Sequence, residues 1–503
     1  MELFIAWFMS KFLILIIRLR DALLKSNALI FNRFIRFYIL VASLVLLSSC
    51  TTFKMIFLNV ASINDLKYFH YKEIAPNNPS NPFVLSHNFK IPKIDAWMTA
   101  KNNIPQLNQE NFLKKTNTTA FIIVRNDTIL YEYHDPSYPN DRPEIIFSLT
   151  KVFVTTLLEI AIEEGYIKSI DQKVSDFLPE FGTSGRENIK LKDVLNMTSG
   201  LNYDDYGKIL KTMKLYYSND LTKIVSNAKL HPDGQKRFVY KSMDTQILGM
   251  CIEKATGRRI SDYLQEKIWT PLNMEQKSFF TEDRKDGEQR MFGGMAASSR
   301  DLMKLARLYL HNGKWNGKQL ISATWIANIR EKKTENEKWW GYTAGWWLDT
   351  SFEDDFLAST DFFSAGYKGQ CLYINPDNNL IILRQGKNRG GINWSSSIGQ
   401  LARIMTTKDS TEMVYPTSND FVGSYSHGKD TLVVSHHKNV WTMHLKSENT
   451  TKRVINLQLY SKLSLYNHGK RIKLLFKIQS NKIIGLYYDD YSPNPVFYGK
   501  NVF

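Results

Sequence analysis

The chain has 503 residues, 43% of them apolar and 13% aromatic, which excludes a disordered or low-complexity protein and allows a full catalytic core with a second, smaller domain. The formal net charge is +16, from 65 Lys and Arg against 49 Asp and Glu. Because the basic residues are scattered among acidic ones, without a zinc-finger spacing, an RNA-binding aromatic motif or a long basic run, we expect no nucleic-acid partner.

The N-terminal part of the chain has the pattern of a secretory signal. Arg33 and Arg36 precede the apolar run Phe37–Leu47, which leads into Ser48-Ser49-Cys50. This run of eleven residues is too short to cross a bilayer, which needs about 20. We therefore predict that residues 1–50 are a membrane-targeting signal region. An earlier apolar stretch inside residues 1–32 is either an over-long start or a membrane helix.

The end of the signal, Leu-Ser-Ser-Cys, resembles a bacterial lipobox, in which the cysteine becomes the lipidated first residue of the mature protein. The resemblance implies a lipoprotein of the bacterial cell envelope, periplasmic or in the outer membrane, anchored through Cys50. The alternative is an ordinary signal peptide with a coincidental cysteine.

A tether is predicted next, followed by the start of a sheet. Residues 51–115 are polar and contain five prolines, which favour extended or turn conformations. Ala120–Arg125 and Thr128–Tyr133 are β-rich runs, and the Asn126-Asp127 between them tolerates the conformation of a tight hairpin. We place a catalytic domain at residues 116–410.

A helix is predicted from Ser148 to Gly165, because apolar residues recur at helical spacing up to a natural stop residue. Ser148-Leu149-Thr150-Lys151 is an SxxK pattern, in which a lysine one turn on can remove the proton of the serine if burial keeps that lysine neutral. The pairs Ser226/Lys229 and Ser435/Lys438 also fit the pattern. Only Ser148 follows a predicted hairpin and opens an apolar helix, so we assign it as the nucleophile.

Two further segments complete the candidate site. Tyr240 and Ser242, in Tyr-Lys-Ser, precede an apolar run, and a phenol near the lysine can pass a proton to a leaving group. Gly366-Tyr367-Lys368-Gly369-Gln370 leads into a predicted strand, and its glycines allow a close approach of backbone to substrate. The backbone amides of Ser148 and Gln370 are the predicted oxyanion donors. The tryptophan pairs 339–340 and 346–347 either line a cleft or pack in the core.

The remaining pattern predicts the fold class and a second domain. Helical segments dominate as far as Leu310, and strands return at Gln370–Asn375 and Leu380–Arg384, which indicates an α+β protein. Residues 411–503 contain five further β-rich runs and are predicted to form a separate, barrel-like β-domain, at Thr431–Ser435, Val440–Leu445, Val454–Tyr460, Ile472–Ile478 and Ile483–Tyr488.

No metal and no cofactor are expected. Cys50, Cys251 and Cys371 are too few for a disulfide framework or a zinc cluster, although the last two are able to pair. His436-His437 has no third ligand near it in the sequence. The sequence leaves the oligomeric state open.

In this order, the motifs resemble those of the serine β-lactamase and penicillin-binding-protein superfamily. Two more segments strengthen the likeness: Leu195–Leu201 is similar to the family's LLxHTSGL stretch, and Gly293–Leu302 to its GGLxSTAxDL segment. Tyr240–Gly249 is similar to YRSxxTxxLG of the 6-aminohexanoate-dimer hydrolase and carboxylesterase branch. Together these segments cover roughly residues 116–405.

The resemblance implies a β-lactamase/transpeptidase-like antiparallel sheet flanked by helices, related to class C β-lactamases. It also implies a small, lipocalin-like C-terminal domain, for which Asp420–Tyr425 resembles the usual start. The implied activity is acyl-enzyme cleavage of an ester or amide bond in a small molecule or peptide, with Ser148, Lys151 and Tyr240 catalytic.

One departure bears on the substrate. Where the family has Lys or His to hold a substrate carboxylate, this chain has Tyr367, and alternation along a strand would turn Lys368 to the opposite side. Ser242, Tyr367, Gly369 and Gln370 are expected to contact the substrate or its oxyanion. The alternatives are a D-Ala-D-Ala carboxypeptidase or weak β-lactamase, and a non-catalytic module that binds the cell wall.

Overall fold

The structure is a computed structural model. It describes residues 61–76, 80–85, 109–139, 141–207, 209–233, 236–331, 341–348, 360–406, 422–437, 440–447, 450–461, 464–467, 472–479, 482–489 and 496–500. The predicted signal and Cys50 lie outside these residues. Within them, no helix combines the length and the apolar character that a bilayer span requires.

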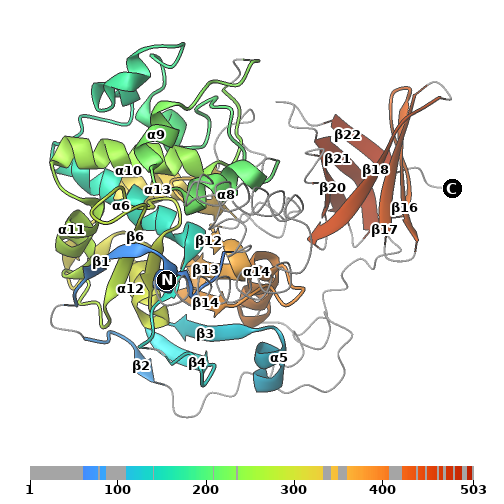
Figure 1. The fold of residues 1–503 in the computed structure, drawn as a ribbon. Coiled ribbons are helices and arrows are strands. Elements are labelled where there is room, and N and C mark those ends of the chain that lie inside the picture. The colour runs from blue at the N-terminus through green and yellow to red at the C-terminus, as the bar shows by residue number, and fades with distance from the viewer. Residues whose placement is uncertain are drawn as a thin grey trace, which may run out of the picture.

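An eight-stranded sheet forms the centre of the main body (Figure 1). All neighbouring strands in it are antiparallel except β2 and β4. In spatial order its strands are β10 Tyr342–Thr343, β11 Trp346–Leu348, β12 Phe362–Gly366, β13 Gln370–Asn375, β14 Leu380–Gly386, β3 Thr118–Arg125, β4 Thr128–His134 and β2 Val84–Leu85.

The predicted hairpin and returning strands are confirmed. Asn126 and Asp127 join β3 to β4 with φ of 51° and 56°, the left-handed conformation that a tight hairpin turn requires. The strand predicted at residues 370–375 has the bounds of β13, and β14 extends its prediction by two residues.

Both faces of the central strands are buried, because β13 and β14 are buried at every position and β3 at every position but its last. On one face Ile122 and Val124 pack with helices α6, α10 and α12, and on the other Phe121 and Ile123 pack with α5 and α14. The predicted α+β architecture, an antiparallel sheet flanked by helices, is therefore confirmed. The helices are α5 Gln109–Lys115, α6 Thr150–Glu163, α7 Leu191–Leu195, α8 Ile209–Tyr217, α9 Leu221–Ser226, α10 Ser242–Thr256, α11 Ile260–Leu264, α12 Ser299–Leu310, α13 Ala323–Arg330 and α14 Trp394–Thr406.

A second, four-stranded sheet includes part of the segment predicted to be a tether. Its order is β1 His70–Ile74, β6 Ser278–Glu282, β7 Met295–Ala297 and β5 Glu144–Ile145. β1 pairs with β6, and Ile63, Phe69 and Ile74 are buried in the main core. Residues 61–74 are thus part of the folded domain, because their spaced apolar side chains have a core to enter.

The C-terminal β-domain is a closed barrel of the strands β15 to β22, set to one side of the main body (Figure 1). Its five predicted strands are present, and β15, β19 and β22 add three shorter ones. Its buried side chains include Tyr425, Leu432 and Met443. The strands are β15 Gly423–His427, β16 Asp430–His437, β17 Val440–Ser447, β18 Thr450–Ser461, β19 Ser464–Asn467, β20 Ile472–Gln479, β21 Lys482–Asp489 and β22 Val496–Lys500.

The two cysteines that the sequence left able to pair are not bonded to each other. Cys251 lies in α10 and Cys371 in β13, and both are buried.

Candidate active site

Ser148 lies in a short turn that leads into the central helix. The helix was predicted to begin at Ser148, but the structure has a 3-10 turn over Phe147–Leu149 and α6 begins at Thr150. Phe147 has a φ of 49°, a left-handed conformation that is costly for a bulky residue. This bend leaves Ser148 half-buried while its neighbours in the turn are buried.

Lys151 is buried directly beneath the serine. Its ammonium donates to Ser148 Oγ at 3.0 Å, to Ser242 Oγ at 3.2 Å and to the Phe292 carbonyl at 2.7 Å. Burial lowers the pKa of Lys151 to about 8, partly offset by the negative charge of Asp205. The lysine can therefore be neutral near physiological pH and take up a proton from Ser148.

The other two SxxK serines lie in different surroundings. Ser226 is the last residue of α9 and donates its hydroxyl to the Thr222 carbonyl within that helix. Ser435 lies in a barrel strand, where its hydroxyl pairs with that of Thr442. Neither lies at a helix start above a buried lysine.

Tyr240 lies against both members of the pair. Its phenol lies close enough to Ser148 for that residue to influence its pKa, and Lys151 Nζ lies 5.2 Å from its ring centroid. The ring stacks on Trp347 at 5.5 Å and meets Tyr342 edge-on at 5.6 Å. Burial raises the pKa of Tyr240 well above its usual range, so its phenol is protonated and able to donate.

The sequence left open whether the tryptophans line a cleft or pack in the core, and residues 346 and 347 do one each. Trp347 stacks on Tyr240 at the site, whereas Trp346 is fully buried against Tyr309 and Phe362. The pair at 339–340 lies outside the described residues.

The residue between Tyr240 and Ser242 holds this segment in place. Lys241 is fully buried and donates to the Met197 carbonyl at 2.9 Å and to Asp244 at 3.4 Å. Asp244 also accepts from Ser199 at 2.7 Å. The start of α10 is thereby tied to the segment that resembles LLxHTSGL.

Sequence reasoning missed Asp205. Its carboxylate accepts the Ser242 hydroxyl at 2.6 Å and the Ser242 backbone N–H at 3.1 Å. Nothing in the sequence distinguishes Asp205 from Asp204 beside it, because both belong to a loop without a motif. Only the path of the loop brings Asp205 to the start of α10.

The segment at Tyr367 is a turn rather than a continuous strand. β12 ends at Gly366, residues 367–369 form a 3-10 turn in which Lys368 has a φ of 67°, and β13 begins at Gln370. The expectation that Tyr367 and Lys368 point to opposite sides, as neighbours in a strand do, therefore does not apply. Tyr367 is 48% exposed and meets Phe147 edge-on at 5.5 Å, and Lys368 Nζ lies 5.0 Å from the Tyr367 ring centroid.

This turn lies beside the turn that carries Ser148. Gly366 pairs with Gln370, and a Cβ on Gly366 would be 2.7 Å from the Ile146 carbonyl, two residues before Ser148. The Gln370 side chain is occupied, since it donates to the Gly386 carbonyl at 2.8 Å and accepts from its N–H at 3.1 Å. What Gln370 can offer a substrate is therefore its backbone.

Buried Arg384 anchors the same turn from below. Its guanidinium donates to the carbonyls of Lys368 at 2.8 Å and Gly369 at 3.0 Å. It also donates to the Thr116 carbonyl at 3.0 Å and to the Thr118 hydroxyl at 3.2 Å. A rigid charged side chain thus fixes a turn whose two positive-φ residues would otherwise be free to move.

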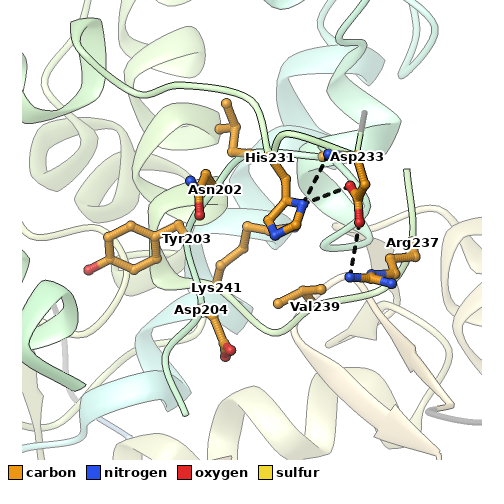
Figure 2. A pocket seen from close by; sticks show the side chains of 10 residues that line it. Asn202, Tyr203, Asp204, His231, Asp233, Arg237, Val239 and Lys241 are labelled. Atoms are coloured by element: carbon orange, nitrogen blue, oxygen red, sulfur yellow. Dashed lines mark hydrogen bonds and ion pairs between the residues drawn. The ribbon is translucent and has the colours of Figure 1, made fainter. Parts of the chain in front are cut away.

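A small hollow is lined in part by Lys241 (Figure 2). There His231 and Arg237 both bind Asp233, at 2.7 Å and 3.2 Å. Ser148, Lys151 and Tyr240 are not among its lining residues. Because its His231 and Arg237 are both occupied by Asp233, we do not assign the reaction to it. Across the described part of the chain, no group of three or more His, Cys, Asp or Glu side chains is arranged to hold a metal ion.

The layered fold, with a serine and a lysine at the start of a central helix, defines a protein of the β-lactamase/transpeptidase-like class. The chain belongs to the Beta-lactamase family, whose family model matches residues 110–385, more than half of the chain. It is a hydrolase of that family.

The similar proteins agree with the predicted branch. A 6-aminohexanoate-dimer hydrolase from Paenarthrobacter ureafaciens is 24% identical over 332 residues, which are 61% of this chain and 79% of that protein. A Bacillus anthracis structure provisionally assigned as a 6-aminohexanoate-dimer hydrolase has 20% identity and a TM-score of 0.57, covering 68% of this chain and 92% of that one. An octameric penicillin-binding protein homologue from Pyrococcus abyssi has 17% identity and a TM-score of 0.50, covering 80% and 98%. The two structures share the fold.

Proposed function

We propose that the protein is a serine hydrolase that cleaves an ester or amide bond through an acyl-enzyme on Ser148. The observation that carries this proposal is the buried Lys151, whose Nζ lies 3.0 Å from Ser148 Oγ and whose pKa is lowered to about 8 by burial. A lysine with these properties is suited to act as a general base.

In the first step Lys151 accepts the proton of Ser148, and the serine oxygen forms a bond to the substrate carbonyl carbon. The carbonyl oxygen becomes an oxyanion, for which the backbone N–H groups of Ser148 and Gln370 are the proposed donors, with Gly369 allowing the backbone to approach. Each such donor contributes roughly 3–4 kcal/mol in other hydrolases.

In the second step the bond to the leaving group breaks. Tyr240, protonated and adjacent to the serine, gives a proton to the leaving alcohol or amine and regains one from Lys151. Water then attacks the acyl-enzyme, loses its proton to the same base, and releases the acid with free Ser148.

The substrate proposed is an ester or amide without a required carboxylate. Tyr367, half exposed beside the nucleophile turn, stands where the family has a cation. The aromatic wall of Trp347 and Tyr342 around Tyr240 favours an apolar group next to the scissile bond. A D-Ala-D-Ala carboxypeptidase or β-lactamase activity has less support, because both substrates present a carboxylate.

The test is covalent labelling by a fluorophosphonate probe followed by turnover of short esters, amides, D-peptides and a chromogenic cephalosporin. Ser148→Ala should abolish labelling while circular dichroism stays unchanged. Ser226→Ala, the matched SxxK serine outside the site, should label at the wild-type rate. Undiminished labelling of Ser148→Ala would refute the assignment, and a cephalosporin rate comparable with that of esters would restore the β-lactamase alternative.

We also propose that the protein is an envelope lipoprotein anchored through Cys50, in a bacterial periplasm or outer membrane. The support is the apolar run that ends in Leu-Ser-Ser-Cys. Cells expressing the wild-type chain and Cys50→Ala should be grown with radioactive palmitate. Label on the wild type and none on the variant is expected, and an unlabelled wild-type chain would refute the anchor.

A further inference from the structure

Asp205 joins the candidate site through Ser242. Its Oδ2 accepts the Ser242 hydroxyl at 2.6 Å, its Oδ1 accepts the Ser242 backbone N–H at 3.1 Å, and Thr212 donates to it at 3.4 Å. Ser242 Oγ in turn accepts from Lys151 at 3.2 Å. A continuous chain of hydrogen bonds thus runs from Asp205 through Ser242 and Lys151 to Ser148.

The direction of each bond in this chain is fixed by what the partners can donate. The carbonyl of Phe292 can only accept. The Ser242 hydroxyl has one proton, and because that proton lies on the bond to Asp205, the hydroxyl can only accept from Lys151. A neutral amine has two N–H groups and one lone pair. With both N–H groups directed to Phe292 and Ser242, the lone pair is left for the hydroxyl proton of Ser148.

We infer that Asp205 is a positioning residue for the base: by holding the proton of Ser242, it turns the lone pair of Lys151 toward Ser148. This inference rests on the proposed function, since it presupposes that Lys151 is the base. Asp205 itself does not contact the reacting atoms. Its role is to decide which of the two serines next to Lys151 accepts from the amine and which one donates.

The negative charge of Asp205 has a second effect, on the pKa of Lys151, which can be measured separately. The main influence on the pKa of Lys151 is burial, which lowers it, and the carboxylate of Asp205 raises it in part. Asp205 is faced in turn by Asp204 and by the phenols of Tyr203, Tyr240 and Tyr342. Removing its charge should therefore lower the pKa of the base, an effect that a purely structural residue would not produce.

The test is Asp205→Asn, measured as the rate of fluorophosphonate labelling at Ser148 across pH 6–9.5. The amide oxygen can still accept the Ser242 backbone N–H, but the amide nitrogen donates to Ser242 Oγ. The freed Ser242 proton then occupies the lone pair of Lys151. We expect the maximal rate to fall about ten- to hundred-fold while the rising limb of the pH profile moves to lower pH.

Two further variants keep the test decisive. Asp204 is a neighbouring carboxylate that accepts the Tyr206 N–H. Asp204→Asn removes its charge, and its labelling rate should stay within a few-fold of that of the wild type. If Asp205→Asn does not fold, Ser242→Ala and Ser242→Thr replace it. The alanine variant should lose the rate and the threonine variant, which keeps the hydroxyl, should restore it.

A double-mutant cycle separates positioning from other roles. If Asp205 acts through Ser242, Asp205→Asn combined with Ser242→Ala should be no slower than the slower single variant. The inference would be overturned if the two substitutions slowed labelling independently, so that their effects multiplied. A pH profile of Asp205→Asn whose rising limb does not move would also overturn it, as would a loss that appears only in KM for amine-bearing substrates. A wild-type protein that does not label at Ser148 would instead refute the proposed function itself.

Discussion

Acylation of Ser148 should depend on pH through the ionisation of Lys151, because only the neutral amine can accept the serine proton. Burial lowers the pKa of this lysine from 10.5 to about 8, and the deprotonated form is the proposed base. The rate should therefore rise with pH and level off above about pH 8. The perturbation is the pH itself, applied to the folded protein between pH 6 and pH 9.5.

The magnitude follows from the size of the shift. At pH 7, about one lysine in ten is neutral when the pKa is about 8, against about three in ten thousand at the ordinary value of 10.5. Burial thus raises the population of active base by about 300-fold, equivalent to about 3.4 kcal/mol. Burial supplies this difference, because loss of solvent around Lys151 is the largest cause of its lowered pKa.

The assay is the pseudo-first-order rate of fluorophosphonate labelling in buffers of constant ionic strength. Lys151→Arg keeps the positive charge but cannot lose its proton, so it should label about 10²–10⁴-fold more slowly and show no rising limb. A wild-type rate that is flat from pH 6 to pH 9.5, or a limb centred below pH 7, would refute the assignment of Lys151 as the base.

Three further outcomes follow from the geometry. Tyr240→Phe should slow turnover by about 10²–10⁴-fold with circular dichroism unchanged, and a wild-type kcat would exclude the phenol from proton transfer. Gly369→Ala, whose Cβ would be 2.7 Å from Trp394, should lower the free energy of unfolding by about 1–3 kcal/mol more than Gly391→Ala, a positive-φ glycine with open space around it, and equal losses in urea denaturation would contradict this. Burial raises the pKa of Glu159 from 4.5 to about 7, so the folded protein keeps the proton of this carboxyl to a higher pH than the unfolded chain does. The free energy of unfolding therefore falls as the pH rises from 4.5 to about 7. Glu159→Gln should therefore gain about 1–3 kcal/mol at pH 8 and nothing at pH 4, and a gain of equal size at both pH values would refute the reasoning.

Local patterns predicted much of the fold and the order of the motifs. The β3–β4 hairpin is present because Asn126 and Asp127 accept the left-handed turn conformation, and β13 and β14 because their apolar runs are too short for helices. The SxxK pattern was ambiguous by itself, and Ser148 was chosen by its position after the hairpin and before an apolar helix.

The environment of those motifs was decided by tertiary structure. Asp205 is one of two adjacent loop carboxylates, and only the folding of that loop onto α10 brings it to Ser242. The turn at Tyr367 was misread as part of a strand, because the first of its two left-handed residues is Lys368 rather than a glycine, and because the turn is held by the buried Arg384 from another strand. The sequence alone determined which residue types stand at the site and in what order. Their ionisation and hydrogen-bond directions depend on burial and on partners from other elements, and only the tertiary structure decides these.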